Sequence, residues 1–197
     1  REAFIEIAAL PLEDEVELHL DHIAPIREDD EYGGFRIAMV ASYQSIHTPL
    51  KIDLTAGDVI TPEAVRYCFP SNFEDRQIEI WAYPIETILA EKVETILRRS
   101  VLNTRPRDFY DVYILSSTHK DRIRRDTFQR AFRATAAKRE SLAVLGAAAT
   151  ILGNIQQDET MRQRWDRYCK ENAYARGIPF DEVLQAVRGY LDEGDST

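Results

Sequence analysis

The chain has 197 residues, 44% of them hydrophobic, which is enough to bury the core of one large or two small domains. Its formal net charge of −9 at pH 7 argues against a protein that coats nucleic acid through its overall charge. The longest apolar run, residues 142–153, is shorter than the ~20 residues that cross a bilayer, so we expect no membrane partner. Two cysteines make no disulfide framework, so we expect the protein to work in the reducing cytoplasm.

The first part of the chain predicts strands. Residues 1–10 have the apolar spacing of the last turns of a helix, and because they lack a starting methionine we expect the natural chain to begin earlier. Apolar and polar residues then alternate, as they do in half-buried strands. Strands are expected at residues 16–23, 35–45, 49–58 and 77–83, with an acidic loop at 28–34.

After Pro84 the apolar spacing changes to that of helices. Pro84 suits a first helical turn, and Arg98 with Arg99 suits the C-terminal end of the same helix. A second helix is expected after residue 103, with Thr104 and Asp108 available for capping. Further helices are expected at 125–139, 142–155, 159–172 and 180–192. This order predicts an α+β fold: a mostly antiparallel or mixed sheet in residues 1–83, then a helical domain in residues 84–197.

Lys92 is the unusual residue of the first long helix. At ~100° per residue it falls inside the arc of apolar side chains, whereas Glu91 and Glu94 fall outside it. One explanation is a long side chain that carries its ammonium to the rim of the core. The other is a cation held at a cleft for an anionic substrate such as a phosphate.

Three aspartates could take part in chemistry with Lys92. Asp108 lies in the first turn of the second helix, where an acid is an ordinary capping residue, and Asp111 lies one turn later on the same side. The two carboxylates could form a charged rim, or could orient Lys92 or a metal-bound substrate. Asp53 lies within a strand on its polar face, where it could bind a metal or play a structural role.

Positive charge is concentrated in residues 98–139. This segment holds 12 Lys and Arg against 4 Asp and Glu, so it carries +8 while the rest of the chain carries −17. Such a region can be a set of solvated helix faces, or a surface for a triphosphate or a nucleic-acid backbone.

Several motifs together resemble the AbiEii/AbiGii toxin family of nucleotidyltransferases. They are "LKIDLTAGD" with Asp53, then "YP" at 83–84, "AEK" ending at Lys92, and "RDFYD" with Arg107, Asp108 and Asp111. The resemblance implies a polymerase-β-like nucleotidyltransferase fold followed by a helical domain. It also implies transfer of a nucleotide from an NTP, with GTP as a candidate, to tRNA or another acceptor with Mg²⁺, by the toxin of a type IV toxin–antitoxin or phage-defence pair.

The same resemblance implies roles for five residues. Asp53 corresponds to a metal ligand or hydroxyl activator, Lys92 to a triphosphate contact, and Arg107 to a further nucleotide contact. Asp108 and Asp111 correspond to the last motif, which positions Lys92 and the nucleotide. The Asp-x-Asp strand motif of the family is missing from the 197 residues. We therefore expect this segment alone to be catalytically inactive. The alternative function is a nucleotide- or RNA-binding module that does not catalyse transfer. The resemblance also implies a cognate antitoxin as a protein partner.

Overall fold

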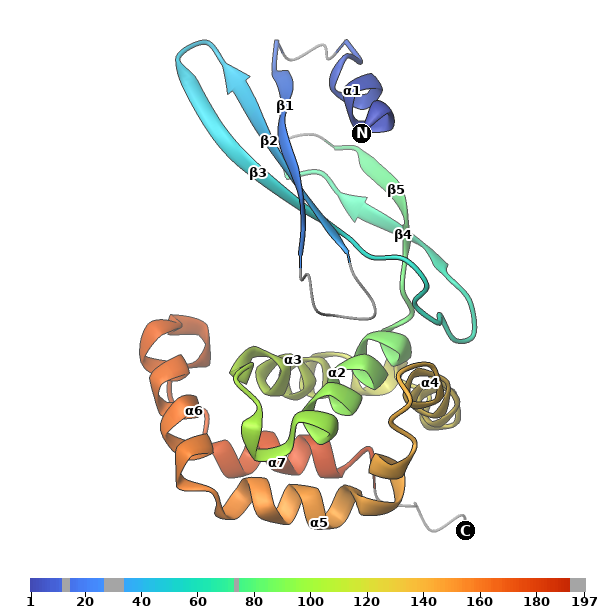
Figure 1. Ribbon diagram of the computed structural model, residues 1–197, viewed down its shortest axis with the longest axis vertical. Coiled ribbons are helices and arrows are strands. Elements are labelled where there is room, and N and C mark those ends of the chain that lie inside the picture. The colour runs from blue at the N-terminus through green and yellow to red at the C-terminus, as the bar shows by residue number, and fades with distance from the viewer. Residues whose placement is uncertain (12–14, 27–33, 73–74, 192–197) are drawn as a thin grey trace. The chain divides into compact units, whose positions relative to one another are not determined.

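The computed structural model describes residues 1–11, 15–26, 34–72 and 75–191 and forms two compact units, Arg1–Asp58 and Val59–Thr197 (Figure 1). The first unit is mainly strands, and the second has a strand pair followed by helices. The predicted fold class is confirmed, because all pairings are antiparallel and the C-terminal region is helical. The expected division at residue 83 falls inside the second unit, between its strands and its helices.

The first unit is a short helix with a three-stranded sheet. Its elements are α1 (Glu2–Ala8), β1 (Glu17–Pro25), β2 (Phe35–Tyr43) and β3 (Ile46–Leu54), with β2 in the centre of the sheet. Ile37 and Met39 of this central strand are the buried apolar residues of the sheet. The third strand was expected at 49–58 and begins three residues earlier. The expected acidic loop at 28–34 lies, apart from Gly34, outside the described residues.

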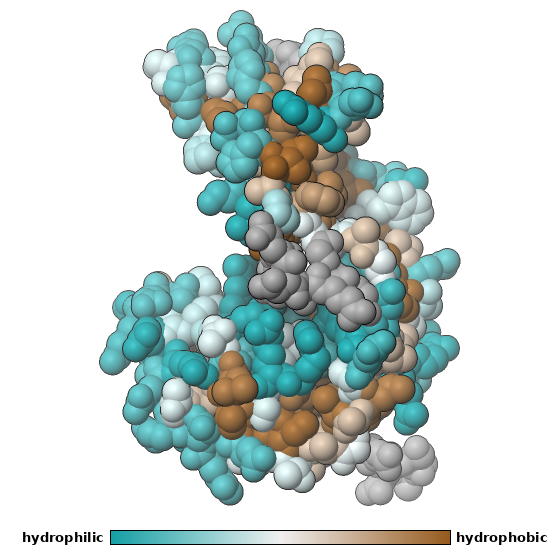
Figure 2. Space-filling view, viewed as in Figure 1, coloured by the Kyte–Doolittle hydropathy of each residue, from teal (hydrophilic) through white to brown (hydrophobic). Residues whose placement is uncertain are grey.

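The second unit begins with the hairpin of β4 (Val65–Pro70) and β5 (Gln77–Ala82). The sequence predicted β5 but not β4, although Val65, Tyr67 and Phe69 alternate with Arg66 and Cys68 as strand residues do. The apolar side chains of this hairpin are about half exposed. Figure 2 shows apolar side chains between hydrophilic ones on the surface of the strand-rich part of the chain.

Within residues 85–191, all of which the structure describes, six α-helices and three short 3₁₀ helices follow. The α-helices are α2 (Ile85–Arg99), α3 (Pro106–Thr118), α4 (Arg125–Lys138), α5 (Ala143–Gln157), α6 (Glu159–Glu171) and α7 (Phe180–Arg188). The 3₁₀ helices are η1 (Ser100–Leu102), η2 (Lys120–Arg122) and η3 (Ala173–Ala175). All six predicted helices are present, with ends within a few residues of those expected. None of the helices in the described ranges is long and apolar enough to cross a membrane.

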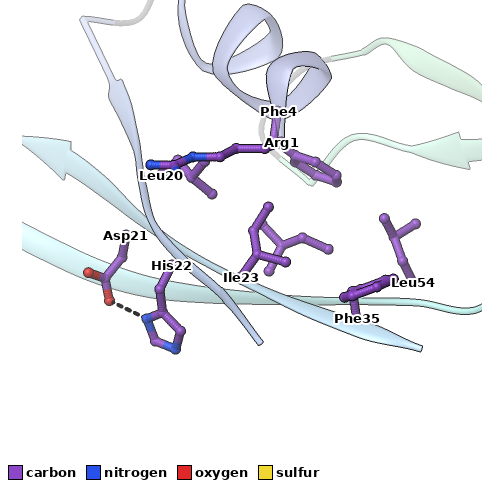
Figure 3. A pocket seen from close by; sticks show the side chains of 9 residues that line it. Arg1, Phe4, Leu20, Asp21, His22, Ile23, Phe35 and Leu54 are labelled. Atoms are coloured by element: carbon purple, nitrogen blue, oxygen red, sulfur yellow. Dashed lines mark hydrogen bonds and ion pairs between the residues drawn. The ribbon is translucent and has the colours of Figure 1, made fainter. Parts of the chain in front are cut away.

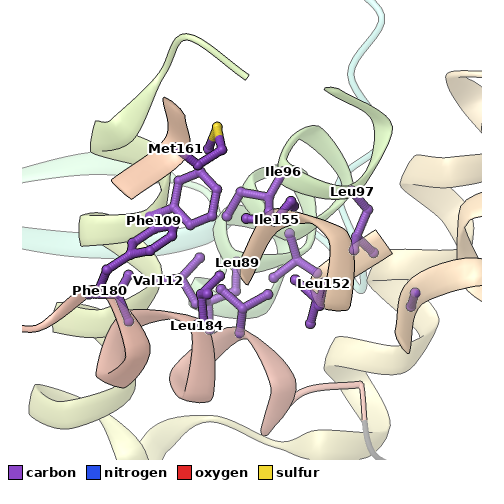
Figure 4. Close-up of a cluster of buried hydrophobic side chains, with 14 of the residues drawn as sticks. Leu89, Ile96, Leu97, Phe109, Val112, Leu152, Ile155, Met161, Phe180 and Leu184 are labelled. Atoms are coloured by element: carbon purple, nitrogen blue, oxygen red, sulfur yellow. The ribbon is translucent and has the colours of Figure 1, made fainter. Parts of the chain in front are cut away.

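The helices enclose one apolar core around α2 (Figure 4). Leu89 and Ile96 of α2 are fully buried, and Phe109 and Val112 of α3 pack in the same cluster. α2 contacts α4 as well as α3, and α7 packs against α3. Because these helices fix α2 and α3 against each other, polar side chains on their shared edge are held in defined positions.

Candidate functional site

Lys92 leaves α2 at the edge that faces α3. Its neighbours Leu89 and Val93 are fully buried, and the side chain of Lys92 itself is 22% exposed. The stem is thus covered by the core while the ammonium reaches the surface between the two helices, as expected for a long cationic side chain at the rim of a core.

The Lys92 ammonium contacts both aspartates of α3. Its Nζ lies 2.5 Å from Asp111 Oδ2 and 3.5 Å from Asp108 Oδ1. The Asp111 side chain is 20% exposed, whereas that of Asp108 is only 4% exposed. The structure therefore brings together three of the predicted site residues, and the closer carboxylate is that of Asp111.

Two arginines complete this charged cluster. Arg105 Nε lies 3.0 Å from Asp108 Oδ2, and Arg107 Nε lies 3.8 Å from Asp111 Oδ1. Three cations thus face two carboxylates, which leaves one surplus positive charge. The Arg107 side chain is 76% exposed, so its guanidinium is the most accessible of the three cations.

Asp108 was expected to help cap α3, and that expectation is wrong. The N-cap residue is Arg105, and no side chain caps it. The Asp108 carboxylate instead faces Lys92 and Arg105, because its position in the first turn directs it toward α2. Thr104, the other expected cap, is exposed and lines the cleft described below.

The turn between α2 and α3 is held by two residues that the sequence did not single out. The buried Asn103 accepts a hydrogen bond from the backbone N–H of Arg105 through Oδ1 at 2.7 Å. Arg164 of α6 donates to the carbonyl oxygens of Val101 and Asn103, both at 3.0 Å. These bonds fix the chain that places Arg105 and Asp108. Arg164 is 61 positions from Asn103, so no local pattern could have revealed it.

The charged cluster lines an open cleft of about 540 Å³. Its lining residues are Lys92, Thr104, Arg105, Pro106, Arg107, Asp108, Asp111 and Tyr168. Burial, together with a hydrogen bond to Tyr174, raises the pKa of Tyr168, so its hydroxyl stays neutral. The cleft thus combines cations with one neutral aromatic side chain, which suits a ligand that is anionic at one end.

Asp53 lies in the first unit, and the other four predicted site residues lie in the second. On β3 it is directly opposite Arg36 of β2, and the Arg36 Nε and Nη2 donate to its two oxygens at 2.7 and 2.8 Å. The hydrogen bond from Arg36 lowers the pKa of Asp53. Asp53 therefore remains ionised, and each of its two carboxylate oxygens accepts a hydrogen bond from the Arg36 guanidinium.

The metal that the predicted chemistry requires does not fit the described residues alone. Within the described ranges, no three His, Cys, Asp or Glu side chains are grouped so that they could hold a metal ion. Asp108 and Asp111 face Lys92, Arg105 and Arg107, and Asp53 faces Arg36. In nucleotide sites Mg²⁺ is held by one or two carboxylates together with phosphates and waters, and each of these three carboxylates is already paired with a cation.

Glu94 lies outside the apolar arc of α2 that contains Lys92, yet the structure buries it. Its side chain is fully buried and contacts Arg139 Nη1 at 2.7 Å, Arg98 Nε at 3.0 Å and Ser141 Oγ at 2.8 Å. This network ties α2 to the end of α4 on a different edge of α2 from Lys92. A single-helix projection does not reveal this burial, because Arg139 approaches from beyond the helix.

A second hollow, of about 490 Å³, lies in the first unit between α1 and the sheet (Figure 3). Six of its nine lining residues are apolar, and the others are Arg1, Asp21 and His22. This mostly apolar lining does not suit a triphosphate, so the cleft at Lys92 is the stronger candidate site.

Comparison with known proteins identifies the class to which this arrangement belongs. Residues 1–186 match the family of the nucleotidyl transferase AbiEii toxin of type IV toxin–antitoxin systems. The chain belongs to this family. No curated protein and no solved structure matches it. The family implies a nucleotidyltransferase toxin with an NTP substrate and a cognate antitoxin, and nucleotidyltransferases generally use divalent metal ions.

Proposed function

We propose that this protein transfers a nucleotide from an NTP, with GTP as the first candidate, to tRNA or another RNA. We further propose that this transfer is toxic to the cell and serves phage defence by abortive infection. The observation that supports the proposal is the open cleft at Lys92 in the second unit, where three cations face two carboxylates. The chain that carries this cleft belongs to a nucleotidyltransferase family.

In this proposal Lys92 and Arg107 bind the triphosphate. Phosphoryl transfer needs little covalent help from a protein and depends on positioning and on cations that stabilise charge. Asp111 and Asp108 hold the Lys92 ammonium at the cleft by their contacts with its Nζ. Arg107 is exposed and offers a planar fork of donors, which matches the geometry of phosphate oxygens.

The proposed reaction is an in-line displacement. An oxygen of the acceptor forms a bond to the α-phosphorus, the bond from that phosphorus to the bridging oxygen breaks, and pyrophosphate leaves. The proton of the acceptor hydroxyl passes to water. Asp53 stays our prediction for a ligand of Mg²⁺, with no step assigned to it.

The alternative is a nucleotide- or RNA-binding module that does not transfer. What favours it is that the 197 residues contain no Asp-x-Asp, the motif expected to supply two metal carboxylates. In this alternative, residues 1–197 bind the NTP in a cytoplasmic setting without transferring it.

The test measures transfer and binding separately. The protein is incubated with each α-³²P-labelled NTP, Mg²⁺ and total tRNA, and labelled RNA is counted. Lys92→Ala should reduce labelling about 100-fold or more, while Lys170→Ala, an exposed lysine of α6, should not change it. Circular dichroism checks that both variants fold.

The outcomes separate the two functions. Labelling that Lys92→Ala abolishes supports the transferase. NTP binding without labelling supports the binding module. Unchanged labelling in Lys92→Ala contradicts the role given to this residue.

A further inference from the structure

A basic surface on the second unit lies outside the Lys92 cleft. Exposed cations of η2 and of the first three turns of α4, with the residue that precedes α4, form it. We call the following six residues the η2–α4 surface: Lys120, Arg122, Arg124, Arg125, Arg130 and Arg133.

Most of these positive charges are not neutralised. Between residues 120 and 133 the only acids are Asp121 and Asp126, and Asp126 pairs with Arg124 at 3.4 Å and with Arg130 at 3.7 Å. No described carboxylate lies within ion-pair distance of the other four cations. Six cations against two acids leave a surplus of +4 in a chain of net charge −9.

The helix that carries this surface is firmly held. Phe128 and Phe132 of α4 are buried in the core, and their rings stack with centroids 5.7 Å apart. Glu86 of α2 accepts a hydrogen bond from the backbone N–H of Arg124 at 2.9 Å, and Gln129 donates to the carbonyl of Tyr190 at 2.8 Å. The arginines therefore project from a rigid element, which lowers the entropy lost when a partner binds.

The surface lacks what a protein partner would need. Protein interfaces are centred on apolar or aromatic anchors. No large apolar side chain between residues 103 and 141, all of which the structure describes, is exposed. Closely spaced cations without anchors match a phosphate backbone, whose charges repeat every few ångströms.

We propose that the η2–α4 surface binds the phosphate backbone of the RNA acceptor. The choice of RNA rests on the proposed function, and the surface itself on the charges above. η2 follows α3, whose first turn carries Asp108, and the 13 residues of α3 span about 20 Å. A ligand that reaches from the cleft to this surface is therefore longer than one triphosphate. An RNA whose end lies in the cleft has that length.

The experiment measures RNA affinity by fluorescence anisotropy, without NTP or Mg²⁺, over about 50 to 200 mM salt. The full chain is compared with Arg122→Gln/Arg125→Gln/Arg133→Gln and with a matched control, Arg167→Gln/Lys170→Gln/Arg176→Gln, which removes three exposed cations around α6 and η3. The probe is a fluorescein-labelled RNA hairpin. Polyglutamate, as an acidic polypeptide, is the competitor.

The η2–α4 variant should bind the hairpin on the order of tenfold or more weakly, and the slope of log K against log salt should fall by about 2 to 3. The control should keep the slope of the parent chain. Equal losses in both triple variants overturn the proposal, and so does polyglutamate that displaces RNA at equal charge concentration. The binding experiment measures no nucleotide transfer, so its result can be interpreted even if the transferase assay fails. A failure of the binding experiment likewise leaves the transferase assay interpretable.

Discussion

The Lys92 ammonium lies 2.5 Å from a carboxylate oxygen of Asp111, across the edge where α2 meets α3. Asp108 lies beside the same ammonium but is more deeply buried, at 4% exposure of its side chain. Each carboxylate also has an arginine, Arg107 for Asp111 and Arg105 for Asp108. The cation that we assign to the triphosphate is thus also part of the contact between two helices.

This double role predicts a moderate cost for Lys92→Met. Removing one member of a fully buried ion pair costs about 3–5 kcal/mol, because a charge is left without compensation. Here both aspartates keep an arginine and Asp111 is partly solvated, so we expect a loss of about 1–2 kcal/mol in the free energy of unfolding, measured in urea.

The coupling between the two residues can be measured with Asp111→Asn and the double variant. We expect the double variant to be more stable than the sum of the single losses predicts, by about 0.5 kcal/mol or more. Lys170→Met, a solvated lysine, should lie within about 0.5 kcal/mol of the parent. Coupling near zero would show that the Lys92–Asp111 contact does not hold the helices together.

The buried Glu94 network predicts a larger effect on stability. Glu94 is fully buried with two arginines and a serine, so Glu94→Gln leaves Arg139 and Arg98 with a weaker partner. We expect a loss of about 2–4 kcal/mol in the free energy of unfolding, measured by urea denaturation.

Glu91→Gln is the matched control, since Glu91 lies one turn earlier, is 26% exposed and is 3.8 Å from Arg139. It should lose less than about 1 kcal/mol. If the two variants lose equal stability, burial is not what makes the Glu94 contacts strong.

What the sequence could and could not predict follows from where the partners lie. The period of α2 placed Lys92 in the apolar arc, and the spacing within one helix placed Asp108 and Asp111 on one side. Both patterns are local, and the structure places the three side chains together. The burial of Glu94 was not predicted, because its partner Arg139 is 45 residues away, at the end of α4.

Long-range register explains the other gaps. Asp53 was recognised as a polar-face residue of a strand, but its partner Arg36 is identified only once β2 and β3 are aligned. β4 was not predicted although its residues alternate, and its partner β5 is identified only once the two strands are aligned. Tyr168 and Arg164 reach the site from α6. They lie some sixty residues from the segment 103–111 that carries Asp108 and Asp111, and no pattern within that segment indicates them.

The Arg36–Asp53 pair predicts a dependence on pH. Its hydrogen bond lowers the pKa of Asp53 below the ordinary value of about 3.9. The stabilisation from this pair is therefore fully present above the unfolded-state pKa and is lost as the pH falls through the lower folded-state value. Arg36→Gln should raise the pKa of Asp53, measured by a ¹³C NMR titration of its carboxyl carbon.

Lys51→Gln tests whether the effect is specific to Arg36. Lys51 lowers the same pKa only through a smaller coulombic effect, so this variant should raise it less than Arg36→Gln does. Equal upward movements would mean that general charge, rather than the hydrogen bond across the strands, sets the pKa of Asp53.

Arg107 offers a way to separate nucleotide binding from stability. Its side chain is 76% exposed and its ion pair to Asp111 is long, at 3.8 Å, so Arg107→Gln should change the free energy of unfolding by less than about 0.5 kcal/mol. If the guanidinium binds a triphosphate, the same change should weaken NTP binding about tenfold, which corresponds to about 1.4 kcal/mol. Isothermal titration calorimetry with GTP and ATP measures the two affinities.

The matched control is Arg176→Gln, which changes an exposed arginine outside the cleft and should leave the affinity for both nucleotides like that of the parent chain. Unchanged affinity in Arg107→Gln would remove Arg107 from the triphosphate site and leave Lys92 and Arg105 as its cations, because these two also line the cleft.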